Sequence, residues 1–263
     1  MRRLLVVASF LVFLAGFQLS ILTEQTEHYF AWTIQPPLTA AFLGAGYWSS
    51  FLLEFLSSRQ RTWVRARIAV PAVFSFATLT LVATLLHFDR FHFASPEPIA
   101  QAAAWFWLAI YLVVPPTMLV MWMRQIRVPG GDPPRQSMLP FSIRLILALQ
   151  SVFMLVIGVT LFIQPSFAPL LWPWKLTPLP ARAVGAWLVG VGIFAGHAVW
   201  ENDFSRVKAG MASYLAFGAL QLLAIERFPS TPDLNQPIAW IYLLLTISVL
   251  ATALYSIAAR RSR

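Results

Sequence analysis

The chain alternates long apolar runs with short polar stretches. Eight of the runs reach roughly the 20 residues that a helix needs to cross the core of a bilayer. They cover residues 4–22, 38–57, 67–87, 100–123, 141–164, 181–200, 207–226 and 237–258. None of them shows the alternation of apolar and polar residues that is typical of a membrane β-strand. Because a lipid-exposed backbone must satisfy its own hydrogen bonds, the pattern predicts eight membrane-spanning helices.

The composition is that of a polytopic membrane protein. Of the 263 residues, 59% are apolar and 11% are charged, against a charged share of about 25% in soluble domains. The 11 Trp and 21 Phe residues fit a surface that faces lipid. The expected partners are therefore the lipid bilayer and other membrane subunits. The absence of Cys excludes disulfides, thiol catalysis and Cys-ligated metals.

We attribute the net charge of +9 to basic residues that orient the protein in the membrane, so we expect no nucleic-acid partner. The first apolar run follows Arg2 and Arg3 without a signal-peptide cleavage site, so it is expected to be a retained span. With the N-terminus inside, the cytoplasmic segments hold 15 of the 19 basic residues: Arg2, Arg3, Arg59, Arg61, Arg65, Arg67, Arg124, Arg127, Arg135, Arg144, Arg206, Lys208, Arg260, Arg261 and Arg263. This bias predicts a cell-membrane protein with both termini in the cytoplasm. Nothing in the sequence indicates an organelle, so we expect a bacterial inner membrane.

An internal repeat divides the chain into two similar halves. A shift of 142 residues aligns the starts of the halves without a gap, and the matched pairs are Arg2 with Arg144, Ser9 with Ser151, Gly16 with Gly158, Trp32 with Trp174 and Pro36 with Pro178. Later matches need gaps, and they pair Gly44 and Gly46 with Gly190 and Gly192, and Asp89, Arg90 and Phe91 with Glu226, Arg227 and Phe228. The matches follow the order of the predicted helices, which indicates a duplication.

The repeat determines the expected symmetry. Each half contains four predicted spans, so both halves enter the membrane from the same side, related by a pseudo-two-fold axis along the membrane normal. The predicted fold is an all-α polytopic membrane protein built from two parallel four-helix repeats, residues 1–127 and 140–263. Residues 128–139, rich in Pro and Gly, form the predicted cytoplasmic linker between them.

Glu54 is the ionisable residue that the pattern places inside the membrane, about one turn from the cytoplasmic end of the second helix. Ionisable residues at such positions are costly and often functional, so Glu54 is a candidate proton or cation site. The structural interpretation, which we favour, is a carboxylate that reaches the interface or pairs with Arg59 or Arg61.

A second candidate site lies on the outer face, where both halves repeat the same residue types. The repeated residues are Trp32, Trp174, Asp89, Arg90, Glu226 and Arg227. An acid beside an arginine at symmetric positions can form a ligand clamp or a docking surface. The simpler interpretation, which we favour, is that the Trp residues anchor the protein at the lipid headgroups and that the charged pairs close helices.

Three histidines also fall on the outer face of the first half: His28, His87 and His92. Imidazole is a common metal ligand, so they are a candidate metal site, although their spacing follows no established pattern. The remaining histidine, His197, has no evident partner at its depth, whereas a haem held between helices is often bound by paired axial ligands. The sequence therefore identifies no cofactor.

Three functions stay open at the level of sequence. The chain contains no phosphate-binding Gly loop, HExxH or GxSxG motif. Sparse intramembrane charge favours a non-catalytic subunit or binding module within a membrane complex, in contact with lipid or a hydrophobic cofactor. The alternatives are a small-solute transporter or channel with a path along the pseudo-two-fold axis, and an intramembrane enzyme or haem carrier. A polar cavity between the halves would favour transport, whereas a packed interface would favour the subunit.

Overall fold

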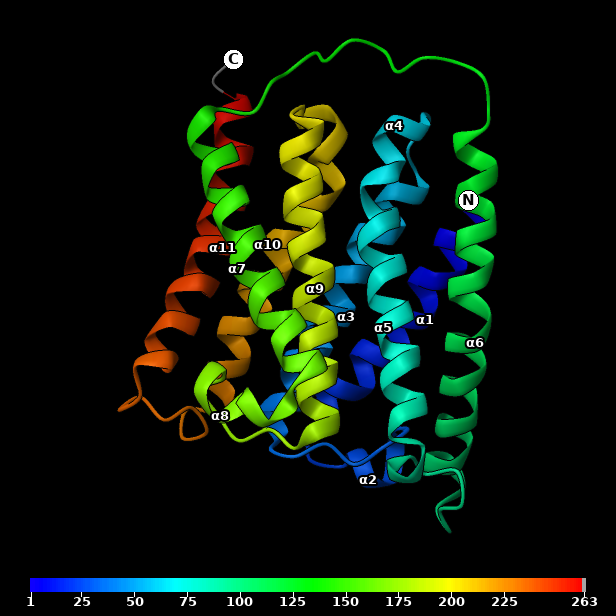
Figure 1. The fold of residues 1–263 in the computed structure, drawn as a ribbon, viewed down its shortest axis with the longest axis vertical. Helices are drawn as coiled ribbons and strands as arrows, with labels where there is room; N and C mark the ends of the chain where they lie inside the picture. The colour runs from blue at the N-terminus through cyan, green and yellow to red at the C-terminus, as the bar shows by residue number, and fades with distance from the viewer. Residues whose placement is uncertain (262–263) are drawn as a thin grey trace.

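The computed structural model describes residues 1–261, which form a bundle of helices (Figure 1). The long helices are α1 (Arg2–Ile21), α3 (Pro37–Ser58), α5 (Val70–Leu86), α6 (Pro98–Ile126), α7 (Phe141–Ile163), α9 (Pro178–Glu201), α10 (Phe204–Arg227) and α11 (Pro237–Arg261). The short ones are α2 (Thr26–Tyr29), α4 (Trp63–Ala66), η1 (Arg67–Ala69), η2 (Phe88–Arg90), η3 (Pro165–Phe167) and α8 (Ala168–Leu171). The described residues contain no β-strand, so the predicted all-α fold is confirmed.

Every apolar segment predicted to cross the membrane is a long helix. Seven helices are long and apolar enough to do so, and one of them runs through α4, η1 and α5. The exception is α3, whose hydropathy is lowered by polar residues such as Ser49, Ser50 and Glu54. Since 16 of its 22 residues are buried, α3 needs little apolar surface toward lipid. The chain is a polytopic helical membrane protein, and its eighth crossing stays a prediction.

Four helices form the centre of the bundle and four flank it. In the centre, α3 packs against α10 and α5 packs against α9. Each central helix carries one flanking helix, with α1 on α3, α6 on α5, α7 on α9 and α11 on α10. In their most apolar windows, 22% to 33% of the residues of the flanking helices are buried, against 50% to 61% in α5, α9 and α10. The flanking helices therefore carry most of the lipid-facing surface.

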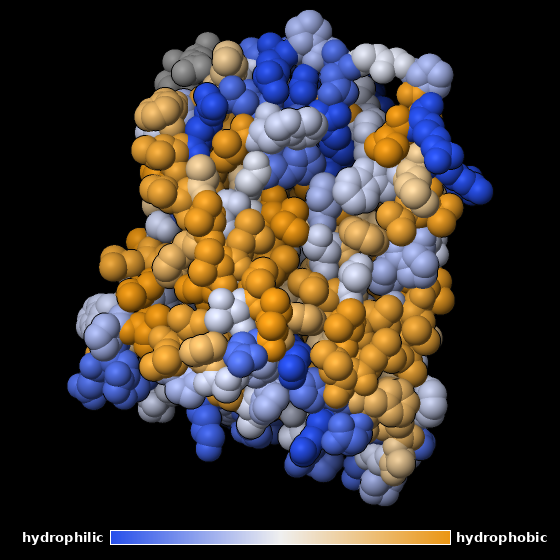
Figure 2. Space-filling model, viewed as in Figure 1, coloured by the Kyte–Doolittle hydropathy of each residue, from blue (hydrophilic) through white to orange (hydrophobic). Residues whose placement is uncertain are grey.

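The surface shows an apolar belt between two polar ends (Figure 2). Apolar side chains fill the middle of the face in view, and polar side chains gather at both ends. Large exposed apolar residues such as Phe10, Phe106 and Leu149 lie on the flanking helices. Exposing an apolar surface of this size to water is unfavourable, so the belt indicates a bilayer environment.

Small residues allow α7 and α9 to pack very closely. A Cβ atom added to Gly158 would lie 2.8 Å from the carbonyl oxygen of Gly185, and one added to Gly185 would lie 2.6 Å from the carbonyl oxygen of Gly158. Nearer the other end of α9, Gly192 and Gly196 lie against Ser151. The Ser151 hydroxyl donates to the Gly192 carbonyl oxygen at 2.8 Å. The small residues of α9 therefore serve packing inside the bundle.

The two ends of the bundle differ in the segments that they carry. One end, named the linker end, carries residues 127–140, α4 and the C-terminal turn of α11, whereas the other end carries α2 and α8 (Figure 1). The Arg2 guanidinium Nε donates to the Ser58 carbonyl oxygen at 2.8 Å. This bond places the start of α1 beside the end of α3, at the linker end.

Candidate functional site

A cavity of about 520 Å³, named the loop cavity, lies at the end of the bundle opposite the linker. Three segments line it: the loop before α3, the η2 turn after α5 and the start of α9. The lining includes Trp32, Thr33, His87, Asp89, Arg90 and Thr177. The structure therefore brings together three residues of the predicted outer-face site, Trp32, Asp89 and Arg90, and adds His87 to them.

His92 fixes the loop that forms one wall of this cavity. Its backbone N–H donates to the Ala31 carbonyl oxygen at 2.9 Å. Its ring Nδ1 lies 2.9 Å from the Phe30 carbonyl oxygen, and its Nε2 lies 3.0 Å from Thr33 Oγ1. Because a carbonyl oxygen only accepts, Nδ1 carries a proton and donates to Phe30. Both ring nitrogens of His92 are thus engaged in holding the loop.

His87 lies against Arg182 of α9. The distance between Arg182 Nη1 and His87 Nε2 is 2.6 Å. A guanidinium only donates, so Nε2 accepts and the ring proton of His87 is on Nδ1. Burial lowers the pKa of His87, and the positive charge of Arg182 lowers it further, so both favour the neutral ring. Arg182 forms no ion pair with a carboxylate of residues 1–261.

The equivalent residues of the second half do not complete this site. Trp174 is buried, and its indole N–H donates to Thr39 Oγ1 at 2.9 Å. Arg227 donates to the Ser20 carbonyl oxygen of α1, and Glu226 is exposed to solvent. The structure therefore separates Glu226, Arg227 and Trp174 from the loop cavity, and does not join the two charged pairs in one clamp.

The interpretation of the two repeated Trp residues as headgroup anchors is wrong. The exposed fraction is 2% for Trp32 and 5% for Trp174, so both rings lie inside the protein. Trp32 packs near Phe30 and Phe91, with ring centroids 6.3 Å away in each case. These Trp residues join the loops to the helix bundle, and they do not face the headgroups.

The three histidines of the candidate metal site have separate surroundings. His28 lies 3.1 Å from Glu27 and 3.6 Å from Glu97, whereas His87 and His92 have the partners described above. Within residues 1–261, no group of three or more His, Cys, Asp or Glu side chains is placed to hold a metal ion. The structure does not bring His28, His87 and His92 together.

Glu54 is buried in the bundle, which corrects the interpretation that we favoured. Its exposed fraction is 1%, and it forms no ion pair with Arg59 or Arg61. Ser50 Oγ donates to Oε1 of Glu54 at 2.9 Å. The other oxygen, Oε2, is buried without a hydrogen-bond partner in the described part of the chain. The reason is geometric. Because α3 is a central helix, its face near the linker end packs against other helices and does not reach the membrane–water interface.

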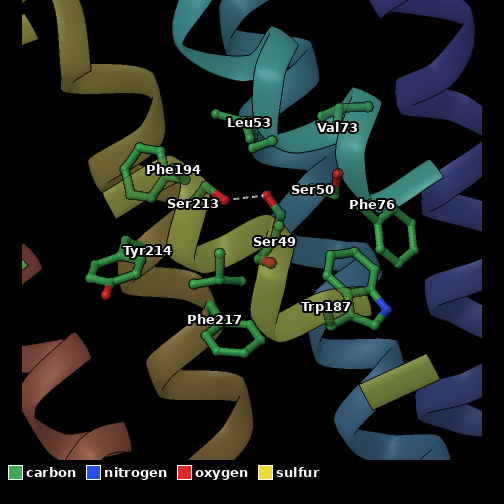
Figure 3. Close-up of a pocket in the computed structure, with 13 residues that line it drawn as sticks. Ser49, Ser50, Leu53, Val73, Phe76, Trp187, Phe194, Ser213, Tyr214 and Phe217 are labelled. Carbon is green, nitrogen blue, oxygen red and sulfur yellow. Dashed lines mark hydrogen bonds between the residues drawn. The ribbon is translucent and has the colours of Figure 1, made fainter. Parts of the chain in front are cut away.

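A small cavity lies between the two halves, among α3, α5, α9 and α10, and is named the central cavity (Figure 3). Its volume is about 40 Å³, room for a few water molecules. Its lining is mainly apolar and aromatic, with three serines, and includes Ser49, Ser50, Phe76, Trp187, Phe194 and Ser213. The Ser213 hydroxyl donates to the Ser49 carbonyl oxygen at 2.7 Å and so joins α10 to α3 across the cavity.

A buried charged cluster at the linker end was missed by the sequence analysis. Glu201, the last residue of α9, is fully buried and forms ion pairs with Arg67 and Arg206, with a distance of 3.0 Å between Arg206 Nη1 and Oε2. Asp132 of the linker pairs with Arg67 at 2.7 Å. His197, one turn before Glu201, lies 3.4 Å from Oε1 and so has the partner that the sequence did not reveal.

The linker is fastened to this cluster. Arg135 Nε donates to the Glu201 carbonyl oxygen at 2.8 Å, and Arg206 Nη2 donates to the Pro133 carbonyl oxygen at 2.6 Å. In Figure 1 the same segment arches across the linker end from α6 to α7. The Pro/Gly-rich stretch is therefore a docked strap that connects the halves by specific hydrogen bonds.

Asp203 supports the strap from the turn between α9 and α10. Its carboxylate accepts from the backbone N–H of Ser205 at 2.7 Å, which caps α10, and from the backbone N–H groups of Gln136 and Ser137 in the linker. Burial alone would raise the pKa of Asp203, but these hydrogen bonds to the charged form outweigh it and lower the pKa. The ionised carboxylate therefore holds both the helix end and the linker.

A weak signal for the charged cluster was present in the sequence. His197 and Glu201 are four residues apart, the spacing that places side chains on one face of a helix. The predicted span, residues 181–200, ends one residue before Glu201, so Glu201 was not among the predicted site residues. Its partners Arg67 and Arg206 were attributed to membrane orientation alone.

Comparison with known protein families, with curated proteins and with solved structures finds no match to this chain. The functional argument therefore depends on the geometry of its own residues.

Proposed function

We propose that the chain is a non-catalytic subunit or binding module within a membrane complex, in contact with lipid or a hydrophobic cofactor. The observation that carries the proposal is the packed interface between the two halves. A path for a solute along the pseudo-two-fold axis needs open space among α3, α5, α9 and α10. Side chains fill most of that space.

Trp187 supports this argument because it occupies the middle of the interface. A Cβ atom added to Gly46 would lie 2.7 Å from the Trp187 ring. On its other side, the ring centroid of Trp187 lies 3.9 Å from that of Phe76. The central cavity that is left, about 40 Å³, is far below the ~300 Å³ at which ligand pockets begin. Such an interface favours a static scaffold over a conducting path.

The proposal includes two parallel four-helix repeats and a cytoplasmic linker end. The pairing of the helices supports the repeats. Within each half, the pair α1–α3 corresponds to α7–α9, and the pair α5–α6 corresponds to α10–α11. Between the halves, a two-fold rotation would exchange the contact of α3 with α10 and the contact of α9 with α5. Basic residues at the linker end, among them Arg67, Arg135 and Arg206, support the orientation. A bacterial inner membrane is the location that we infer.

Native mass spectrometry tests the proposal on the protein extracted from its own membrane in a mild detergent. We expect one or more stoichiometric partner proteins, or the mass of a bound hydrophobic cofactor. A bare monomer or homodimer that carries only ordinary lipid would contradict the subunit proposal. In that case the transporter described below would become the favoured function.

The transporter is the second candidate, and Glu54 is the observation in its favour. Its Oε2 atom is buried without a partner in the described chain, and its partner Ser50 lines the central cavity. Solute uptake by proteoliposomes under a proton gradient would test this function with Glu54→Gln, which keeps the shape and removes the charge. Uptake that is abolished by this variant would favour transport, and uptake that survives would remove Glu54 as the coupling residue. The enzyme or haem carrier gains no supporting observation from the described residues.

A further inference from the structure

Glu54 of α3 is a carboxyl group that the protein encloses without a counter-charge. Its exposed fraction is 1%, and it forms no ion pair within residues 1–261. Ser50 Oγ donates to Oε1 at 2.9 Å, whereas Oε2 is buried without a hydrogen-bond partner in the described part of the chain. An isolated carboxylate is among the most costly groups to remove from water, and such a group usually takes up a proton instead.

The basic side chains near the linker end of the surrounding helices do not supply the missing positive charge. Arg67 and Arg206 both pair with Glu201, and none of the others forms an ion pair with Glu54. These basic residues are Arg2 and Arg3 on α1, Arg65 on α4, Arg67 on η1, His197 on α9, and Arg206 and Lys208 on α10. Tyr111 of α6 interacts electrostatically with Glu54, but its hydroxyl is bonded to another tyrosine hydroxyl and carries no positive charge.

We propose that Glu54 is a proton-binding site, so that its side chain is a neutral carboxylic acid in the folded protein at neutral pH. A proton suits this site because it needs no room, and Oε2 is out of reach of water. Hard metal cations take about six oxygen ligands or more, whereas Ser50 Oγ is the oxygen that meets this carboxyl group. The neutral acid leaves one oxygen without a partner, which is much less unfavourable than an uncompensated charge. The site is independent of the proposed subunit function.

The second half shows that the repeated fold does not require this acid. The match of Gly44 and Gly46 with Gly190 and Gly192 places Gly196 and Trp200 at the positions of Ser50 and Glu54. In α9 the equivalent helix therefore forms without a hydroxyl and a carboxyl at these positions. The pair of Ser50 and Glu54 is a property of the first half alone.

Ser50 connects the acid to the space between the two halves. It lines the central cavity (Figure 3), whereas Glu54 is not among the lining residues. Since Oε2 does not reach water, the proton of Glu54 leaves either by way of the Ser50 hydroxyl or after the helices around α3 separate. Ser50 is therefore the positioning residue of the site.

Infrared spectroscopy of the full-length protein, in a detergent without ester carbonyl groups, tests the proposal. The C=O stretch of a carboxylic acid lies apart from the bands of a carboxylate, and carbon-13 in the glutamate side chains moves it to lower frequency. At neutral pH we expect one glutamic acid band in the parent protein. It is assigned to Glu54 because the other glutamates are exposed or, in one case, ion-paired and therefore ionised. They are Glu24, Glu27, Glu97 and Glu226, which are exposed, and Glu201, which is paired.

Three variants connect this band to the site. Glu54→Gln is expected to lose the band, and Glu226→Gln, which replaces an exposed carboxylate, is expected to retain it. Ser50→Ala should keep the band and move it to higher frequency, because the acid loses its hydrogen bond. The amide bands of the same spectra report whether each variant is folded, and the isotope shift of the parent protein does not depend on any variant.

Two results would overturn the proposal. One is the absence of a glutamic acid band from the parent protein at neutral pH, and the other is a band that Glu54→Gln retains. Neither result bears on the subunit proposal, which depends on the partners found by native mass spectrometry.

Discussion

The carboxylate of Glu201 is surrounded by the guanidinium groups of Arg67 and Arg206 and by the His197 ring. Moving a charge out of water costs several kcal/mol, so a fully buried carboxylate is tolerated only with close and well-oriented partners. Here the partners come from η1 before α5, from α9 itself and from α10. The Glu201 side chain thus holds together three helical segments, and its backbone carbonyl oxygen accepts from Arg135 of the linker.

Neutralising this carboxylate is expected to destabilise the protein. Glu201→Gln leaves the buried Arg206 and the partly buried Arg67 with only Asp132 as a counter-charge, and breaking a buried ion pair in this way typically costs about 3–5 kcal/mol. The measurement is the free energy of unfolding in mixed micelles titrated with denaturing detergent.

Glu226→Gln is the matched control for this experiment. Glu226 is exposed and forms no ion pair with another described residue, so its replacement should change the free energy of unfolding by less than about 0.5 kcal/mol. Equal effects of the two substitutions would show that the cluster does not stabilise the linker end.

At the scale of helices, small residues decide which surfaces meet. α7 and α9 approach until the backbone of Gly158 touches that of Gly185, because neither has a Cβ atom. Across the middle of the bundle, Gly46 of α3 leaves room for the Trp187 ring of α9. In a bilayer, association of helices depends on such close packing, since apolar surface gains little by leaving lipid. Glycines therefore select the helix pairs.

A methyl group at the α7–α9 contact is expected to force the helices apart. In Gly158→Ala the new Cβ atom would meet the Gly185 carbonyl oxygen at 2.8 Å and the Val189 nitrogen at 2.9 Å, and backbone atoms cannot turn away. Overpacking costs about 1–3 kcal/mol, which opposes a gain of about 1 kcal/mol in helix propensity. We expect a net loss of stability, measured by thermal unfolding in detergent.

Gly131→Ala is the control, because nothing lies within 4 Å of a Cβ atom at this linker position. It should unfold at the same temperature as the parent protein. If Gly158→Ala were as stable as this control, the close α7–α9 contact would be refuted.

At the scale of the whole molecule, the central position of α3 explains its unusual composition. α3 packs on α1 and α10, and 16 of its 22 residues are buried, so Ser49, Ser50 and Glu54 meet protein and not lipid. Hydropathy alone underestimates such a helix, because the scale assumes that the span faces lipid. Whether α3 crosses the membrane determines whether each half has four spans.

Labelling of single cysteines with a membrane-impermeant maleimide tests this topology, and the absence of native Cys removes any background. Gln25→Cys lies before α3, Arg61→Cys lies after it, and both side chains are exposed. In intact cells we expect labelling of Gln25→Cys but not of Arg61→Cys or Gly131→Cys, which should react only after the membrane is opened. Labelling of Gln25→Cys and Arg61→Cys from the same side would contradict the eighth span.

The sequence by itself determined the class of this protein and the positions of its helices. Length and hydropathy of a segment are local properties, and in a bilayer they leave a helix as the stable outcome. For this reason residues 38–57 and 141–164 were predicted within a few residues of α3 and α7. Likewise, Trp32, Asp89 and Arg90 could be selected from repetition alone, before their common cavity was known.

Only the tertiary structure decided which of these residues meet. Arg67 and Glu201 are 134 residues apart, so their ion pair depends on how α5 packs on α9, which no local pattern encodes. The same holds for Arg182 beside His87, and for Glu54, whose surroundings follow from the central place of α3. In a bilayer, apolar residues are tolerated on every face of a helix, so hydropathy cannot separate a lipid-facing surface from a buried one. Burial, charge pairing and the loop cavity are therefore properties of the assembled bundle.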